Sequence, residues 1–233
     1  MSPSELPEQL AALDELIVRF GAAEDPAAAQ AVGFALLNKT ALLINAERPD
    51  DAVTAAEELL SLFERQPDDR DLAGFGEMLL DASFWLLTWE RNEVVVGICQ
   101  AVADRLADSP GERRVAVAAG ARLHAAVALS RTGRADEAPL MLEQLHAMGE
   151  PALQALDRAE RRFGDAPANE AWLAQVALNR VPILLRLGRA EEARAAMDAV
   201  TERFGARDSP VTAELIDELR QAVDRAARGD ESP

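Results

Sequence analysis

The pattern that most constrains the fold is a set of residues that recurs at the same distances along the chain. Leu37, Leu80 and Leu123 follow one another at steps of 43 residues, and Leu178 comes 55 residues later. A second leucine column and a column of small residues repeat these steps: Leu43, Leu86, Leu129 and Leu184, and Ala52, Val95, Ala138 and Ala193. Three independent columns with identical offsets mark four copies of one structural unit.

One complete copy runs from Phe163 to Pro210. A turn at residues 163–167 precedes a long apolar segment, a short loop at residues 188–193 and a second segment that ends at Phe204. Two amphipathic helices joined by a tight turn cannot bury their apolar faces alone, so the copies must stack on one another. The chain is rich in Ala, Leu, Glu and Arg and only 4% aromatic, which is typical of helices. The sequence therefore predicts an all-α fold, an α-solenoid of about four helix hairpins.

A single amphipathic helix is predicted at each end of the repeats, over residues 5–20 and 210–228. The first carries an apolar stripe at Leu6, Leu10, Leu13, Ile17 and Phe20, and the last at Val211, Leu215, Ile216, Leu219 and Val223. A helix that is apolar on one side only can cap the stack in water. We expect a single domain over residues 1–228, with residues 229–233 as a flexible tail.

Three dipeptides, Asp25-Pro26, Ser109-Pro110 and Ser209-Pro210, combine a capping side chain with proline and predict helix starts. The third pair is longer than the others by 14 residues, and residues 149–151 (Gly-Glu-Pro) lie inside the added segment. Proline in a helix interior removes a hydrogen bond and clashes with the preceding turn. The sequence predicts two helices there, over residues 135–148 and 151–163, or one sharply kinked helix.

The loop segments at residues 132–138 (TGRADEA) and 187–193 (LGRAEEA) resemble those of tetratricopeptide repeat (TPR) proteins. The resemblance covers residues 26–204, and the long repeats are similar to the lengthened TPR-like repeats of many bacterial proteins. The family period is about 34 residues, whereas the step here is 43, and Glu47 and Glu90 stand where the family has Gly. The resemblance implies a protein or peptide ligand held by the concave face, which the first helices line.

A polar column lies between the two leucine columns. It consists of Asn38, Asp81, His124 and Asn179, and the resemblance directs it to the concave face. We take as candidate binding residues Asn38, Asp81, His124, Arg131, Asn179, Arg180 and Arg186. Arginine beside amide groups suits a carboxylate, so an acidic peptide segment or a free carboxylate is the expected ligand. The competing interpretation is that these residues only solvate the face and satisfy helix ends.

Composition and motifs argue against several functions. The formal net charge of −17 disfavours a nucleic-acid partner. The single cysteine, Cys99, lies in an apolar helix and is expected to be buried, and His124 and His146 do not form a zinc motif. No phosphate loop or nucleophile elbow is present, so we expect neither enzyme activity nor a cofactor or metal. The absence of a signal-like start and of an apolar run of about 18 residues predicts a soluble cytoplasmic protein without membrane contact.

These observations favour a non-enzymatic scaffold that binds a protein or peptide in the groove of the solenoid. A regulatory subunit that senses a small anionic molecule or peptide is the alternative, and an all-helical hydrolase that uses acidic residues is a weaker third. A homodimer stays open as well. Trp85 and Trp89, one helical turn apart, are interpreted either as core residues or as an exposed anchor for a partner.

Overall fold

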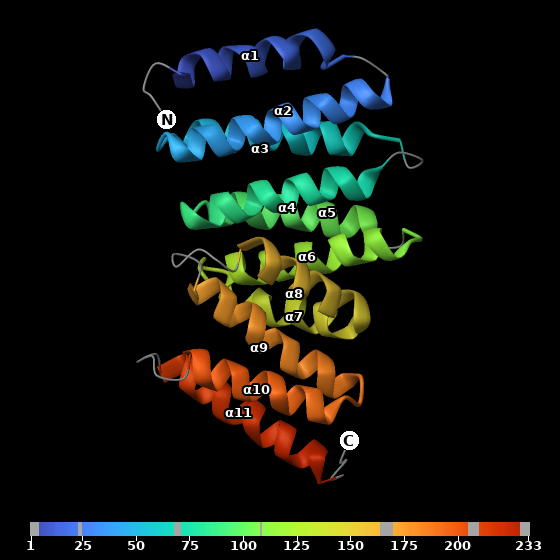
Figure 1. Cartoon of the computed structure of the whole chain (residues 1–233), viewed down its shortest axis with the longest axis vertical. Helices are drawn as coiled ribbons and strands as arrows, with labels where there is room; N and C mark the ends of the chain where they lie inside the picture. The colour runs from blue at the N-terminus through green and yellow to red at the C-terminus, as the bar shows by residue number, and fades with distance from the viewer. Residues whose placement is uncertain are drawn as a thin grey trace. The chain divides into compact units, whose positions relative to one another are not determined.

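A computed structural model describes residues 5–22, 25–67, 71–107, 109–163, 170–204 and 210–228. In these ranges the chain forms eleven α-helices and one short 3-10 helix, without any strand, so the all-α prediction is confirmed (Figure 1). In chain order the elements are α1 (Glu5–Phe20), α2 (Pro26–Asn45), α3 (Pro49–Arg65), α4 (Leu72–Thr88), α5 (Asn92–Leu106), α6 (Glu112–Leu129), η1 (Ala135–Glu137), α7 (Ala138–Ala147), α8 (Glu150–Phe163), α9 (Glu170–Arg186), α10 (Ala190–Phe204) and α11 (Pro210–Ala227).

The two terminal helices lie where the sequence predicts them, as α1 and α11. Asp25 caps α2 by accepting a hydrogen bond from the Ala28 N–H at 2.8 Å, and Pro26 is the first helical residue, as predicted. The prediction for Ser109 is wrong, because α6 begins only at Glu112. The Ser109 N–H instead donates to the Leu106 carbonyl oxygen at the end of α5. Ser209 and the tail at residues 229–233 lie outside the described residues.

The chain divides into two compact units, Met1–Ala138 and Pro139–Pro233, where the sequence predicts one continuous domain. In the N-terminal unit α2 packs against α1, α3 and α4, and α4 packs against α5 and α6. In the C-terminal unit α9 packs against α8, α10 and α11. Most of the helices that pack together in each unit are thus close in sequence.

The leucine columns form the core. All eight leucines are buried except Leu80, which is half-buried, and the small-residue column is buried throughout. The predicted alignment of the four copies therefore describes which side of each helix is packed.

Glycines add a column of their own, since Gly33 and Gly76 are 43 residues apart. A Cβ atom at Gly76 would lie 2.7 Å from Val117 Cγ1, so glycine permits the close approach of α6 to α4.

The break in the third copy is confirmed. Helix α7 ends at Ala147, Gly149 has a φ of 63°, and α8 begins at Glu150. Pro151 falls in the first turn of α8, where its missing N–H leaves no helical hydrogen bond unmade. The proline that interrupts the longer pattern therefore starts a new helix.

Three of the loops that follow a first helix have the same backbone geometry. The second residue after the helix is left-handed in each: Glu47 (φ 59°), Glu90 (φ 57°) and Gly188 (φ 72°). The next residue donates its N–H to the carbonyl oxygen five positions back, as in Arg48 to Leu43 and Arg91 to Leu86. This is the Schellman ending of a helix, in which glycine is usual. These three loops therefore share one turn, although two of them have glutamate where glycine is usual.

Replacing Glu47 or Glu90 with glycine is expected to raise the free energy of unfolding by about 0.5 to 1 kcal/mol each, because glycine enters the left-handed region without a Cβ clash. Urea unfolding of the single variants measures this. The control is Glu58→Gly in the middle of α3, which is expected to lower stability by about 1 kcal/mol. A loss of stability at positions 47 and 90 would contradict the assigned turn geometry.

Candidate functional site

The predicted polar column divides into one exposed and three buried residues. Asn38 is exposed on α2. Asp81, His124 and Asn179 are buried, with only 7%, 3% and 5% of their surface accessible to solvent. These three side chains lie within the packing of their helices, so they do not offer a surface to a partner. The sequence shows that the column is polar but cannot show how closely neighbouring helices cover it.

Burial changes the chemistry of the two histidines. It lowers the pKa of His124 to about 4, so this imidazole is neutral at pH 7. Burial also lowers the pKa of His146, whose Nε2 lies 2.9 Å from Asn179 Oδ1 within the C-terminal unit. The Asn179 amide donates in turn to the Gln175 carbonyl oxygen. Asn179 is thus engaged in an internal polar contact.

The three candidate arginines have different surroundings. In the C-terminal unit Arg180 is held by Asp157 at 2.7 Å and Glu160 at 2.8 Å, and Arg186 is exposed at the end of α9. In the N-terminal unit Arg131 is exposed just after α6. It forms no hydrogen bond or ion pair through its side chain with any residue that the structure describes. Arg131 is therefore a cation without a carboxylate of its own.

Sequence reasoning missed a fourth column, in which all members are arginine: Arg48, Arg91, Arg134 and Arg189. Its steps are again 43, 43 and 55 residues. The recurrence of the same residue type at these steps could have revealed the column from the sequence alone. In three of the four copies the arginine directly follows the left-handed residue of the loop. The shared turn geometry therefore fixes the backbone position from which each of these three side chains extends.

Two of these arginines pair with acidic residues of an earlier helix in the N-terminal unit. Arg91 Nη2 lies 2.7 Å from Asp50 Oδ1 at the start of α3, and Arg134 Nη1 lies 3.3 Å from Glu93 Oε2 at the start of α5. Arg134 also holds Glu137 at 2.6 Å. Each is a partly exposed ion pair that contributes on the order of 0.2 to 1 kcal/mol. Arg189 makes the equivalent local contact with Glu192 in the C-terminal unit.

A hollow of about 360 Å³ lies on this edge of the N-terminal unit, lined by residues 90–94 and 131–133. We call it the loop-edge hollow. Within it Arg91 and Glu93 are already paired with Asp50 and Arg134, whereas Arg131 is unpaired among the described residues. Thr132 fixes the wall, because its Oγ1 donates to the Leu129 carbonyl oxygen and accepts from the Arg134 N–H.

Two buried polar atoms also belong to residues that line the hollow. Arg91 Nε and Asn92 Oδ1 form no hydrogen bond with the described part of the chain. Buried donors and acceptors are normally satisfied by protein groups or by ordered water. The residues that line the loop-edge hollow therefore include an exposed guanidinium and two buried polar atoms that no described group of the chain satisfies.

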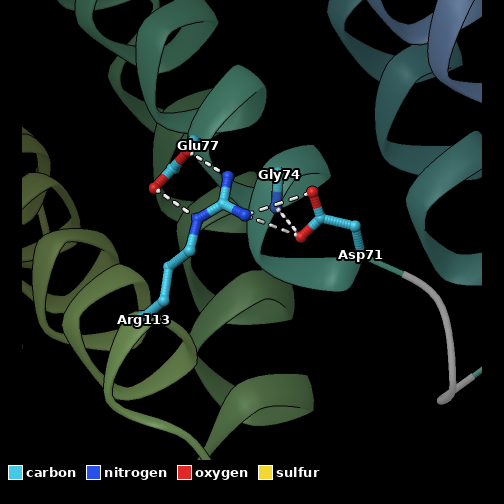
Figure 2. A network of polar contacts seen from close by, with 4 residues as sticks. All are labelled: Asp71, Gly74, Glu77 and Arg113. Atoms are coloured by element: carbon cyan, nitrogen blue, oxygen red, sulfur yellow. Dashed lines mark hydrogen bonds and ion pairs between the residues drawn. The ribbon is translucent and has the colours of Figure 1, made fainter.

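A second polar network, shown in Figure 2, joins the starts of α4 and α6. Arg113 Nη2 lies 2.7 Å from Glu77 Oε2, and its Nη1 lies 3.0 Å from Asp71 Oδ1. Asp71 also accepts from the Gly74 N–H and so caps α4. The hydrogen bonds to Glu77 are the main reason why the pKa of Arg113 is raised. Because every charge here has an internal partner, this network holds two helices together.

Other candidate chemistry is also placed by the structure. Cys99 is fully buried as expected, and burial raises the pKa of its thiol to about 12, so it is not a nucleophile at neutral pH. Trp85 and Trp89 are both half-buried, so they are neither fully buried core residues nor fully exposed anchors. The residues described contain no group of three or more His, Cys, Asp or Glu side chains that could hold a metal ion.

One described helix, α2, is long and apolar enough to span a membrane, but 50% of that segment is buried inside the fold. A core helix has the same properties, so this is weak evidence for a span.

No protein-family model, curated protein or solved structure matches this chain.

Proposed function

We propose that this chain is a non-enzymatic protein-binding module, an α-solenoid of TPR-like helix hairpins that captures an acidic peptide segment or a free carboxylate. The single observation that carries the proposal is Arg131, an unpaired guanidinium in the loop-edge hollow of a protein whose net charge is −17. The recurring leucine, glycine and arginine columns support the repeat architecture. The resemblance of the loops to TPR loops supports a peptide or protein as ligand.

The state of the neighbouring arginines argues for Arg131 as the contact. Arg91 and Arg134 already hold carboxylates of this chain, so a ligand would have to replace Asp50 or Glu93 to use them. Arg131 has no such pair to give up. A guanidinium offers two parallel N–H groups to one carboxylate, which makes the contact directional as well as charge-assisted.

The bound carboxylate would lie beside groups that the loop holds in fixed positions. Thr132 is locked by its two hydrogen bonds, and Gly133 adds backbone without a side chain. Preorganised walls reduce the conformational entropy lost on binding. Arg186, exposed in the C-terminal unit, is kept as a second proposed contact for the same class of ligand.

A specific response to charge reversal follows from this role of Arg131. Random peptides displayed on phage and selected on the wild-type protein are expected to be enriched in Asp, Glu or a free C-terminal carboxylate. Arg131→Glu is expected to weaken the selected peptides by about 10- to 100-fold, since it removes the pairing cation and adds a repulsive charge.

The matched control is Arg225→Glu, which makes the same charge change at an exposed residue of α11. It is expected to change affinity by less than about twofold at moderate salt, where the long-range effect of the changed net charge is screened. Equal weakening by the two variants would mean that the peptides respond to net charge alone. Selection of peptides without acidic groups would contradict the proposed ligand class.

A further inference from the structure

A second hollow of the N-terminal unit has a different character from the loop-edge hollow. It has a volume of about 300 Å³ and lies between α1 and α3, with α2 beneath it. We call it the α1–α3 groove. Its apolar lining comes from Val32 and Leu36 of α2, Leu62 of α3 and Ile17 of α1. Because α1 and α3 each pack against α2, the floor of the space between them is apolar, and the fold itself leaves only 3% of Val32 and 2% of Leu36 exposed.

Helix α1, which forms one wall, is incompletely covered. None of its side chains is buried, although Leu6, Leu10, Leu13 and Ile17 of its apolar stripe are half-buried. Val18 is 84% exposed and Phe20 38% exposed, and they are next in sequence to the groove residues Ile17 and Gly21. An amphipathic helix gains most of its stability from the packing of its apolar face. Further cover at this end of the unit would therefore stabilise α1.

The rim on the α3 side is acidic. Glu57 and Glu58 are exposed, line the groove and form no side-chain hydrogen bond or ion pair with the described residues. Arg65 is the cation at this rim. Unlike the other acidic pairs described above, which are held by arginines of this chain, these two carboxylates are available to an external cation. An apolar floor with an acidic rim is complementary to a helix that carries leucine-like side chains and lysine or arginine.

We propose that the α1–α3 groove docks a basic amphipathic helix of a partner protein. A large apolar side chain of that helix fills the hollow over Val32 and Leu36, and its lysines or arginines pair with Glu57 and Glu58. A second copy of this chain is the wrong occupant, because two copies that each carry a net charge of −17 repel one another. The groove and the loop-edge hollow use different residues and opposite charges, so this proposal is independent of the role of Arg131.

The probe is a synthetic leucine–lysine peptide of about 18 residues with its leucines on one helical face. Its affinity is measured by fluorescence anisotropy for the wild-type protein and for Glu57→Gln/Glu58→Gln. The double variant is expected to bind about tenfold more weakly, since it loses two partly exposed ion pairs. The control is Asp198→Asn/Glu202→Gln on α10, which removes the same charge from two exposed residues and is expected to change affinity by less than about twofold.

Ser61→Arg tests the position without removing any acid. Ser61 is exposed on α3 and lines the groove, so the arginine is expected to weaken the peptide at least as much as the double glutamine variant while leaving the fold intact. Hydrogen exchange in α1 and α3 is expected to slow when the peptide binds. No binding to the wild type, equal weakening by the α10 control, equal affinity for a leucine–glutamate peptide, or self-association through this groove would each overturn the proposal.

Discussion

Phe63→Ala is expected to lower the free energy of unfolding by about 3 to 5 kcal/mol, a large share of the 5 to 15 kcal/mol by which a typical domain is stable. The Phe63 ring is fully buried at the end of α3 and is among the largest side chains without exposure. Its removal leaves a cavity, because the surrounding helices are close-packed and can relax only in part.

The ring also supports a contact between successive copies. Arg105 of α5 lies over it, with the guanidinium carbon 5.2 Å from the ring centroid. Its Nη1 donates to the carbonyl oxygens of Phe63 and Glu64 at the end of α3, and its Nη2 donates to that of Gln66. The last carbonyl oxygens of a helix lack the N–H of a following turn, although that of Phe63 also accepts from the Gln66 N–H. The Arg105 cation supplies further hydrogen bonds to them and interacts favourably with the negative end of the helix dipole. Phe63→Ala therefore removes both packing and the platform beneath this arginine.

Phe34→Ala is the matched control, because Phe34 is 50% exposed on α2 and loses the same atoms. It is expected to cost less than about 1 kcal/mol. Urea unfolding followed by circular dichroism measures both variants. Similar losses at positions 63 and 34 would show that the end of α3 is not packed as described.

The second large effect is a dependence of stability on pH that passes through His124. Burial holds the pKa of this imidazole at about 4, compared with about 6.5 in an unfolded chain. Between these values the unfolded state binds a proton and the folded state does not, so stability falls as pH drops from 7 to 4. The shift corresponds to about 3 kcal/mol lost over that range.

The measurement compares wild type with His124→Gln by urea unfolding at several pH values between 7 and 4. The difference in unfolding free energy between the two proteins is expected to change by about 3 kcal/mol, because carboxylate titrations are common to both and cancel. His124→Leu serves as a second variant without a titrating group. Parallel pH profiles for wild type and both variants would refute the burial of a neutral histidine at this position.

The sequence predicts the packed faces of this protein better than its exposed ones. The leucine columns mark the core because burial demands apolar side chains at fixed helical phase. The break at Gly149 follows from local backbone chemistry, since Pro151 lacks an N–H and would clash with the preceding turn of a continuous helix. Both features are decided within a few residues, so a single sequence contains them.

Features that depend on neighbouring helices could not be predicted in the same way. Asp81 and His124 occupy the phase expected for a concave face, but the approach of adjacent helices buries them. Ser109-Pro110 has the pattern of a helix start, yet the serine closes the preceding helix. The pairing of Arg91 with Asp50 joins residues 41 apart. The one indication of such contacts in the sequence is that arginine recurs at the same steps as the leucine columns.

NMR of the arginine Nε–H signals can decide whether Arg131 captures a carboxylate. A peptide selected on the wild-type protein is titrated in two forms, one with its Asp, Glu and terminal carboxylates intact and one with all of them converted to amides. We expect a saturable shift of the Arg131 Nε–H signal with the acidic form and none with the amide form. Binding of the acidic peptide without a change at Arg131, or equal binding of both forms, would contradict this role of Arg131.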